Sequence, residues 1–343
     1  MPLNLSADLS NDVSILEKQT YIYIFAAIVL GFIGFFGFVL NLLIVITVVK
    51  NANVLWTPTN VVLVNMVVGD FLVAALGNPF ALTSAIAGSW FWSHEMCLWY
   101  AWFMTTMGFA SIGNLTMMAI ERFLLVVYPM KTFSIRHAYI LAFLVWIYAL
   151  SLSLPPFFNW GTYGPEAGNI SCSVSWEIHD PETHNDTYIG FLFLFGFFLP
   201  IIIIIGSYCG IIKTVKKIGK RISAKNRREK KVTKMVYLMI LAFLIAWSPY
   251  AVLALATQYF NVQPSHIVAV LPALLAKSSI CYNPIIYATM TVQFPNIWKK
   301  MFSSNGNNLK NKQQHGSNTK ANFELKTEKK SANRLSTQLN GKT

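Results

Sequence analysis

The stretch LPALLAKSSICYNPIIY, from Leu271 to Tyr287, carries a single charge in an otherwise apolar and uncharged run. That charge is the amine of Lys277, and no acidic residue stands near it in the sequence. A charged amine at the centre of a bilayer costs roughly 2.5 to 3.5 kcal/mol, so an ionisable residue inside a membrane segment indicates a functional site. A lysine amine is also the group that forms a Schiff base with an aldehyde. Lys277 is therefore the first candidate binding residue of the chain.

The length and composition of the chain predict several segments of this kind. Of its 343 residues 55% are hydrophobic and 12% are charged, and the mean hydropathy is +0.48. An α-helix needs about 20 apolar residues to cross a hydrocarbon core of roughly 30 Å. The sequence therefore predicts an all-α fold, a bundle of seven transmembrane helices at about 21–49, 58–86, 96–120, 138–158, 188–212, 235–258 and 267–290.

The basic residues indicate the orientation of these helices. A net charge of +13 suggests nucleic-acid binding in a soluble protein, but here the Lys and Arg residues gather in a few loops and the tail. Eleven of them lie between Lys213 and Lys234, whereas most acidic residues fall in the alternate loops. Because Lys and Arg mark the cytoplasmic side of a membrane protein, we expect an extracellular N-terminus, a cytoplasmic C-terminus and no nucleic-acid partner.

The chain divides into four parts on this interpretation. They are an extracellular N-terminus at 1–20, the bundle at 21–290, a short membrane-surface helix at 291–302 and a disordered cytoplasmic tail at 303–343. The surface helix is expected because aromatic residues alternate with lysines there, and the tail because it is rich in Asn, Lys and Ser. The first span is expected to act as a signal anchor. Glycosylation sequons on the predicted outer face begin at Asn4 and Asn185.

Polar residues and prolines inside the spans give further indications. Asn41, Asp70 and Asn283 are expected to bond to one another, directly or through water, across the first, second and seventh helices, and a purely structural cluster is the alternative. Pro249 and Pro284 predict kinks in the sixth and seventh helices. The two halves of the chain show no repeat, which argues against the inverted-repeat transporters.

From about Tyr21 to Phe302 the chain resembles a rhodopsin-like G-protein-coupled receptor. The motifs that carry this resemblance are Gly37 to Asn41, Asn65 to Asp70, Cys97 with Cys172, Glu121-Arg122-Phe123, Trp146, Pro155-Pro156, Pro200 with Tyr208, Trp247-Ser248-Pro249-Tyr250 and Asn283-Pro284-Ile285-Ile286-Tyr287. Receptors of many ligands share these motifs. A lysine six residues before Asn283 is typical of opsins, so the chain resembles an opsin more narrowly. Cys97 and Cys172 both face the oxidising side and are expected to form a disulfide, with two free thiols as the alternative.

The resemblance implies a pocket for 11-cis-retinal, joined to Lys277 as a protonated Schiff base. Plain core packing is the alternative for the aromatic residues of this pocket, and Lys277 favours the ligand pocket over it. The residues that the resemblance places around the chromophore are Tyr100, Thr105, Gly108, Phe109, Phe197, Phe243, Trp247, Tyr250 and Ala276.

A buried protonated Schiff base needs an anion, because desolvation would otherwise drive off its proton. Vertebrate visual pigments use a glutamate in the third helix, but the matching residue here is Tyr100. Glu166, six residues before Cys172, resembles the second-loop glutamate that serves as counterion in many invertebrate opsins. Ser171 matches the hydroxyl that links this carboxylate to the Schiff base. A solvated loop glutamate is the alternative.

The resemblance also implies a switch at the cytoplasmic face. Glu121-Arg122-Phe123 replaces the commoner triplet of acid, arginine and tyrosine. We expect Arg122 to pair with Glu121, and also with Glu229, until the sixth helix moves outward. The other residues that the family uses in this change are Tyr208, Asn283, Pro284 and Tyr287.

The expected function is that of a light-activated receptor rather than an enzyme, in a plasma or photoreceptor membrane. Its expected partners are membrane lipid, a heterotrimeric G protein of inhibitory or transducin-like type, and arrestin and a receptor kinase at the tail. The alternative is an opsin-like photoisomerase that supplies 11-cis-retinal without signalling. Thr291-Val292-Gln293 departs from both common opsin signatures, and no cysteine follows Cys281. The sequence favours a ciliary-like, non-visual or invertebrate opsin.

Overall fold

The structure is a computed structural model that describes residues 5–128, 133–218 and 224–290. Within these ranges the side chains of 5–16, 218 and 224–229 are not described. The bundle forms one compact unit that ends at Met290. The surface helix expected at 291–302, the tail at 303–343 and the sequon residue Asn4 lie outside the described residues.

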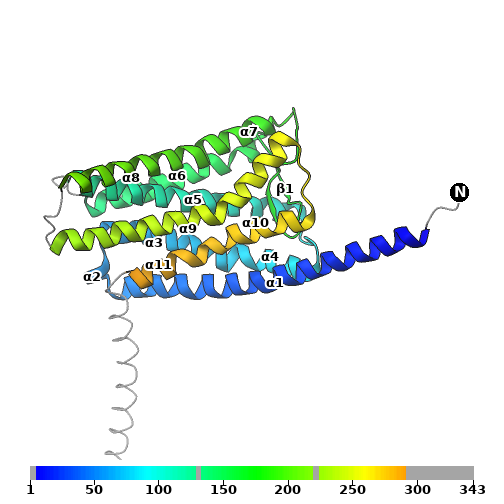
Figure 1. Ribbon diagram of the computed structural model, residues 1–343, viewed down its shortest axis with the longest axis horizontal. Helices are drawn as coiled ribbons and strands as arrows, with labels where there is room; N and C mark the ends of the chain where they lie inside the picture. Colours follow the sequence, from blue (N-terminus) through cyan, green and yellow to red (C-terminus); the bar gives the residue numbers. More distant parts are fainter. Residues whose placement is uncertain (1–4, 129–132, 219–223, 291–343) are drawn as a thin grey trace, which may run out of the picture. The chain divides into compact units, whose positions relative to one another are not determined.

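Among the described residues, seven helices are long and apolar enough to cross a membrane, so the predicted bundle is confirmed. Figure 1 shows them packed side by side along one common direction. In chain order the spans consist of α1 (Leu5–Lys50), α3 (Pro58–Leu72) with α4 (Asn78–Ala87), α5 (His94–Val127), α6 (Ile135–Ser153), α7 (Asn185–Phe191) with α8 (Leu199–Ile218), α9 (Ala224–Phe260), and α10 (His266–Ser278) with α11 (Tyr282–Met290).

Three of these spans change their helical geometry close to a proline. The π-helical turns η1 (Val73–Gly77) and η3 (Leu192–Phe198) lie just before Pro79 and Pro200. The 3₁₀ turn η4 (Ser279–Cys281) lies just before Pro284. Proline lacks the N–H that would bond four residues back, and local π or 3₁₀ turns absorb the mismatch. At Pro284 the residue four positions earlier is Ile280, and its carbonyl accepts a hydrogen bond from Asn41 Nδ2 at 3.0 Å instead.

The helix ends follow from local sequence signals. Thr57 and Ser93 cap α3 and α5 with their side-chain oxygens, and Ser134 caps α6. Gly88 ends α4 with a φ of 80°, a conformation that glycine adopts readily. The fourth span was expected to reach residue 158, but α6 ends at Ser153 because two prolines follow and form the 3₁₀ turn η2 (Pro155–Phe158). At the other end of the chain α1 starts at Leu5, well before the expected residue 21.

The second outer loop folds into a short hairpin over one end of the bundle. Strand β1 (Tyr163–Pro165) pairs with β2 (Cys172–Val174) in antiparallel register, with Pro165 opposite Cys172. Cys172 forms the expected disulfide with Cys97 at the start of α5. The hairpin is therefore fixed to α5, and the residues between its strands, including Glu166 and Ser171, are held at the end of the helical bundle.

Polar side chains tie the helices together inside the bundle. Asn65 on α3 donates to Asn114 Oδ1 on α5 at 2.8 Å and accepts from Trp146 Nε1 on α6 at 2.9 Å. Large apolar side chains face outward instead, among them Phe32 and Phe35 on α1, at 60% and 62% exposure. An apolar outer face with hydrogen-bonded polar groups inside is what a bilayer requires of a helical bundle.

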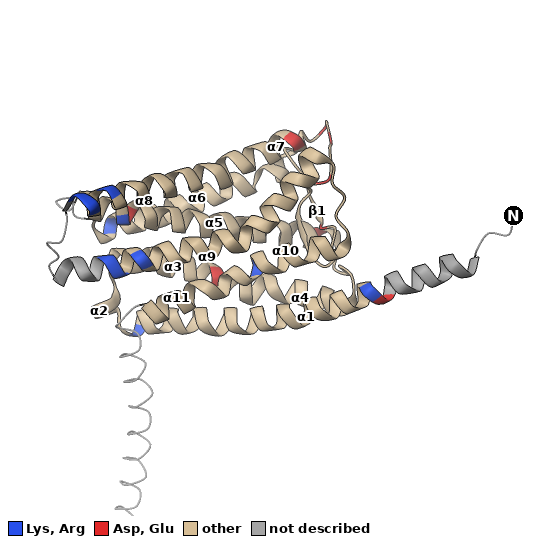
Figure 2. Ribbon diagram, viewed as in Figure 1, with Lys and Arg blue, Asp and Glu red and all other residues tan. Residues whose placement is uncertain are grey.

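Charged residues lie mainly at the two ends of the bundle. Figure 2 shows Lys and Arg gathered where α8 ends and α9 begins, and most of the acidic residues of the outer loop around α7 and β1. This separation agrees with the loop distribution from which the orientation was predicted.

Candidate functional site

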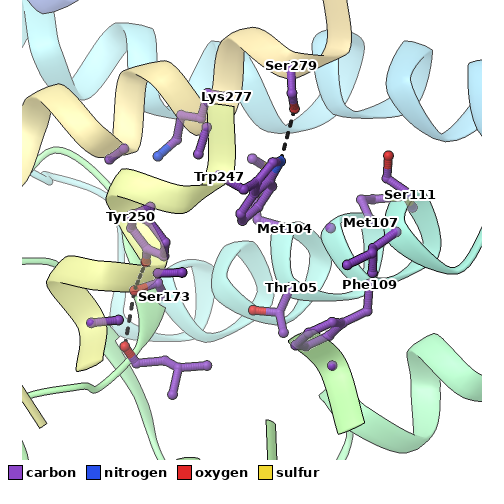
Figure 3. Close-up of a pocket in the computed structure, with 18 of the residues that line it drawn as sticks. Met104, Thr105, Met107, Phe109, Ser111, Ser173, Trp247, Tyr250, Lys277 and Ser279 are labelled. Atoms are coloured by element: carbon purple, nitrogen blue, oxygen red, sulfur yellow. Dashed lines mark hydrogen bonds between the residues drawn. The ribbon is translucent and has the colours of Figure 1, made fainter. Parts of the chain in front are cut away.

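A cavity lies inside the bundle beneath the hairpin, enclosed by α5, η3, α9, α10 and strand β2. Its volume is about 170 Å³, and on the same measure a single buried water needs roughly 10–15 Å³, so the cavity has room for a ligand of many atoms. Figure 3 shows Lys277 on one side of it, with Thr105 and Phe109 of α5 on the other. The lining is mostly aromatic and aliphatic, which is typical of a small-molecule site with a few orienting polar groups.

Eleven of the twelve residues expected around the chromophore line this cavity. The exception is Ser171, which lies one step behind it and bonds to Glu166. The eleven are Tyr100, Thr105, Gly108, Phe109, Glu166, Phe197, Phe243, Trp247, Tyr250, Ala276 and Lys277.

Lys277 supplies the reactive amine of the cavity. Its Nζ lies 3.4 Å from Ser171 Oγ and 3.8 Å from Glu166 Oε2. Its side chain is 13% exposed, and no other Lys or Arg appears among the described residues that line the cavity. An amine in a largely apolar cavity is a nucleophile placed where a hydrophobic aldehyde can reach it.

Glu166 is the centre of a polar network at the outer end of the cavity. Tyr250 donates its hydroxyl to Glu166 Oε1 at 2.9 Å, and Ser171 donates to Oε2. Burial raises the pKa of the Glu166 carboxyl, but the charge of Lys277 and the hydrogen bonds from Ser171, Tyr250 and Ser173 lower it more. The net result is a pKa below the ordinary value, so the group is an anion at neutral pH.

The hairpin explains why this glutamate reaches an amine on α10. The backbone N–H of Glu166 donates to the carbonyl of Ser171 at 2.9 Å, and the N–H of Asn169 donates to the carbonyl of Glu166 at 2.7 Å. These two bonds close the turn between the strands, while the disulfide at Cys172 fixes the turn against α5. Both Glu166 and Ser171 are thereby directed to the end of the cavity that holds Lys277.

Trp247 and Gly108 form a close contact at the wall of the cavity. A Cβ atom on Gly108 would lie 3.1 Å from Cη2 of the Trp247 ring, so the glycine leaves room for the indole. The indole Nε1 donates to Ser279 Oγ at 3.1 Å. This bond joins α9 to η4, which begins two residues after Lys277. Phe243 packs against the same indole at a centroid distance of 5.5 Å.

Tyr100 occupies the position where the visual pigments carry their helical glutamate. It is fully buried, and its hydroxyl has no hydrogen-bond partner among the described residues. Its ring lies 5.2 Å from the ring of Trp90. A buried hydroxyl that lines the cavity without a partner marks a place where a bound ligand could supply one.

Some lining residues were missed in the sequence. Trp176 donates its Nε1 to the Tyr250 hydroxyl at 3.0 Å, and Ser173 Oγ lies 3.2 Å from the same hydroxyl oxygen. Both follow Cys172 closely, and the alternation of strand β2 was the only signal that could have pointed Ser173 inward. The other polar or sulfur-containing lining residues that the sequence did not suggest are Met104, Met107, Ser111 and Ser279, all in helical segments.

Of the three intramembrane polar residues Asn41, Asp70 and Asn283, Asp70 lines the same cavity. Asn283 Nδ2 donates to Asp70 Oδ2 at 3.0 Å, as expected for the second and seventh helices. Asn41 does not bond to either of them through its described contacts. Its amide donates instead to the backbone carbonyls of Gly37 and Ile280. The Ile280 carbonyl can accept this bond because Pro284, four residues later, has no N–H to donate to it.

The residues of the expected switch gather at the end of the bundle where the basic residues lie. Arg122 Nη2 lies 2.9 Å from Glu121 Oε1, and both side chains are almost fully buried. Tyr208 donates to the carbonyl of Thr233 on α9 at 3.3 Å. The side chain of Glu229, the other expected partner of Arg122, lies outside the described part of the structure.

Phe123 and Tyr287 are held by neighbours that the sequence did not suggest. Phe123 packs so closely on α8 that a Cβ atom on Gly210 would lie 2.3 Å from its ring. The Tyr287 hydroxyl donates to Asn60 Oδ1 on α3 at 3.0 Å.

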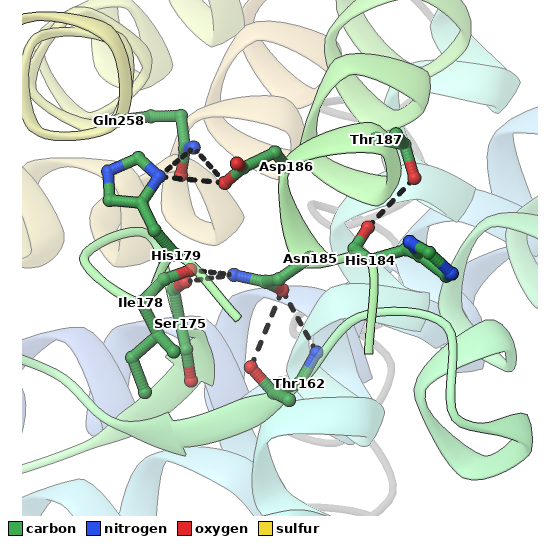
Figure 4. Close-up of polar contacts among 9 residues, drawn as sticks. All are labelled: Thr162, Ser175, Ile178, His179, His184, Asn185, Asp186, Thr187 and Gln258. Atoms are coloured by element: carbon green, nitrogen blue, oxygen red, sulfur yellow. Dashed lines mark hydrogen bonds and ion pairs between the residues drawn. The ribbon is translucent and has the colours of Figure 1, made fainter. Parts of the chain in front are cut away.

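The structure buries Asn185, one of the two residues where glycosylation was expected. Asn185 is fully buried, and its Nδ2 donates to the carbonyls of Ser175 and Ile178 at 2.8 and 2.6 Å. Its Oδ1 accepts from the backbone N–H of Thr162 at 3.0 Å (Figure 4). An amide nitrogen that already donates two buried bonds is inaccessible to a glycan. The residue closes the outer loop instead.

Comparisons with known proteins identify the family and the fold. The family model of the rhodopsin family of seven-transmembrane receptors matches residues 40–287. The chain is 35% identical over 282 residues to rhodopsin of Sminthopsis crassicaudata, which covers 80% of this chain and 78% of that protein. It is 35% identical over 268 residues to the green-sensitive opsin of Gallus gallus, with 76% and 75% covered. The crystal structure of squid rhodopsin superimposes with a TM-score of 0.75 at 29% identity, covering 83% of this chain and 86% of that one. The chain thus belongs to the rhodopsin family of seven-transmembrane receptors and, within it, to the opsins: it is a multi-pass membrane protein and a light-activated G-protein-coupled receptor.

Proposed function

We propose that the chain binds 11-cis-retinal through a protonated Schiff base on Lys277, with Glu166 as its counterion. The observation that carries this proposal is the 3.8 Å approach of Glu166 Oε2 to Lys277 Nζ at the end of an apolar cavity. Bound retinal supplies a conjugated chain that absorbs light and changes shape by isomerisation. Two features of the described residues fit such a ligand: the lining contains a single amine, and the Tyr100 hydroxyl has no hydrogen-bond partner.

Some of the residues around the amine would balance its charge, and others would exclude water. The Glu166 carboxylate balances the positive charge at Lys277, and Tyr250 and Ser171 hold that carboxylate in place with hydrogen bonds. Trp247, Phe243 and Phe109 exclude water from the apolar length of the cavity. Exclusion of water matters because a desolvated cation depends on its counterion far more than a hydrated one does.

In this proposal, a change in the cavity is transmitted to α9 and η4 through Trp247. Its indole touches both the cavity and Ser279 on η4, and Pro249 follows it two residues later in α9. A change in the shape of the cavity would alter this contact and the balance between two positions of α9. At the opposite end Arg122 would then leave Glu121 and become available to a heterotrimeric G protein, for which the basic ends of α8 and α9 favour an inhibitory or transducin-like type.

The orientation and the remaining partners complete the proposal. The N-terminus would be extracellular and the C-terminus cytoplasmic, supported by the basic residues at the ends of α8 and α9. Arrestin and a receptor kinase would act on the tail after residue 303, which contains many Ser and Thr residues.

Two linked measurements on the expressed chain test this function. After addition of 11-cis-retinal, a pigment band should form, change on illumination and accompany light-dependent nucleotide exchange on a purified G protein. A pigment that converts all-trans-retinal to the 11-cis form without any nucleotide exchange would indicate a photoisomerase rather than a receptor. Failure to form any pigment would reject the proposed chromophore.

A further inference from the structure

The hydroxyl of Thr59 lies between the two members of the Glu121–Arg122 pair. Thr59 Oγ1 donates to Glu121 Oε1 at 2.6 Å and accepts from Arg122 Nη2 at 2.6 Å. The same Nη2 donates to Glu121 Oε1 at 2.9 Å. Thr59 Oγ1, Arg122 Nη2 and Glu121 Oε1 therefore form a closed ring of three hydrogen bonds. No motif in the sequence had drawn attention to Thr59.

The burial of the pair makes this third member important. The side chains of Arg122 and Glu121 are 3% and 1% exposed. A buried ion pair must offset the loss of water around both charges, and its own attraction does so only when further hydrogen bonds are present. Glu121 Oε2 has no partner among the described residues, so Thr59 and Arg122 together satisfy the other oxygen. Removal of the Thr59 hydroxyl should therefore weaken the hold of α3 on the Glu121–Arg122 pair.

The position of Thr59 is fixed by the start of α3. Pro58 occupies the first turn of the helix, and the Thr57 side chain accepts from the N–H of Asn60 at 3.4 Å. Thr59 thus sits in the first turn, where the positive end of the helix dipole favours a nearby carboxylate such as Glu121. Its hydroxyl is held in place by the backbone as well as by its two partners.

The next residue of the same turn binds a second switch residue. Asn60 accepts from the Tyr287 hydroxyl at 3.0 Å and donates from its Nδ2 to the carbonyl of Leu55 at 2.7 Å. One turn of α3 therefore contacts the Glu121–Arg122 pair from α5 and Tyr287 from α11. Any rearrangement that frees both groups must break contacts with this turn.

We propose that Thr59 is a positioning residue of the receptor switch, which holds the Glu121–Arg122 pair closed until light acts. Thr59 acts through the pair and touches neither the chromophore cavity nor, in this account, the G protein. The inference rests on the proposed function, because the role of Arg122 as the switch comes from there. It adds α3 to the elements that set the resting activity.

The test compares dark and light nucleotide exchange on a purified inhibitory G protein, with equal amounts of pigment. Thr59→Val removes the hydroxyl at nearly constant volume. It should raise dark exchange about tenfold, the change in an equilibrium that corresponds to about 1.4 kcal/mol, and leave the absorption spectrum unchanged. Thr59→Ser keeps a hydroxyl and should return dark exchange to the level of the unaltered chain. Thr59→Ala provides a second variant without the hydroxyl, and the same rise is expected.

Thr116→Val is the matched control. Thr116 is buried on α5, the helix of Glu121 and Arg122, and among the described residues its hydroxyl bonds only to the carbonyl of Ile112 in its own helix, at 2.8 Å. A rise in dark exchange confined to Thr59→Val and Thr59→Ala supports the proposal. No rise in either of them, an equal rise in Thr116→Val, or no return with Thr59→Ser overturns it.

Failure of the proposed function gives a different result from failure of this inference. If the unaltered chain forms a pigment but shows no light-dependent nucleotide exchange, the proposed signalling function and the role of Thr59 are both rejected. If the unaltered chain signals normally and the Thr59 variants keep its low dark activity, only the role of Thr59 is rejected. A double variant with Glu121→Gln gives a further check, because a hydroxyl that acts through Glu121 should add little once the carboxylate is gone.

Discussion

Glu166 Oε2 lies 3.8 Å from Lys277 Nζ, although one residue comes from the hairpin of the outer loop and the other from α10. The hairpin turn, the disulfide and the hydroxyl of Tyr250 all fix the carboxylate on this side of the amine. With Glu166 as the proposed counterion, Tyr100 on α5 would be a neutral neighbour. The predictions below concern this pair first and the opposite end of the bundle second.

Glu166→Gln should make the dark pigment lose its proton near neutral pH. The substitution removes the negative charge at nearly constant volume, so a cation at Lys277 is less stable. The absorption band should move towards the ultraviolet, and acidification should bring it back. Tyr100→Phe is the control and should change the spectrum little, because a neutral phenol contributes at most one hydrogen bond. An unshifted band in Glu166→Gln across a pH titration would rule Glu166 out as the counterion and direct attention to Asp70 or a bound chloride.

The stability of the retinal-free protein should depend on pH through Glu166. The pKa of this carboxyl is lowered in the folded protein by Lys277 and by its hydrogen bonds, which outweigh burial. A depressed pKa stabilises the fold above the ordinary value of about 4.3, and this contribution disappears as the pH falls through the lower folded value. The melting temperature of the unaltered chain should therefore exceed that of Glu166→Gln at neutral pH, with the gap narrowing in acid. A gap that stays constant down to about pH 3 would contradict the ion pair.

Arg122→Ala should separate light absorption from signalling. The residue lies at the opposite end of the bundle from Lys277, so the absorption spectrum and its response to light should not change. Nucleotide exchange in the light should fall by about tenfold or more, a loss of at least about 1.4 kcal/mol, because the guanidinium would no longer be available to the G protein. Full light-dependent exchange by this variant would show that the switch lies elsewhere.

Asn185→Ala should destabilise the outer loop without removing a glycan. The change leaves the carbonyls of Ser175 and Ile178 and the N–H of Thr162 without this partner, at a total cost of about 2 to 5 kcal/mol. The measurements are the thermal half-life of the pigment and gel mobility before and after glycosidase treatment. Thr187→Ala destroys the same sequon but leaves the Asn185 side chain in place, so it should keep most of the stability. A loss of glycan mass in Thr187→Ala would show that Asn185 is modified after all.

The helical bundle could be predicted because a bilayer imposes a simple rule on the sequence. Each span needs an uninterrupted apolar stretch, and the seven stretches correspond to the seven long helices of the structure. The exact helix ends were harder to predict. The end of α6 at Ser153 depends on two consecutive prolines rather than on hydropathy, and α1 begins well before its apolar stretch.

The helical part of the site could also be placed in advance, because the resemblance to opsins assigned Lys277, Trp247 and Gly108 to positions within long helices. The outer loop could not be placed in advance. Its fold depends on contacts between residues far apart in the sequence, such as the bond from Trp176 to Tyr250 and those of Asn185. A sequon contains no information about burial, so the buried position of Asn185 could not be predicted from it. Thr59 was missed for the same reason, since its partners lie on another helix.

The central claim is that Lys277 carries the chromophore, and chemical trapping tests it most directly. The expressed chain is incubated with 11-cis-retinal in the dark, treated with borohydride to reduce the imine, and digested for mass spectrometry. The account predicts one retinyl group, on the peptide that contains Lys277, and none in Lys277→Ala. A retinyl group on a different lysine, or the same adduct in Lys277→Ala, would contradict it.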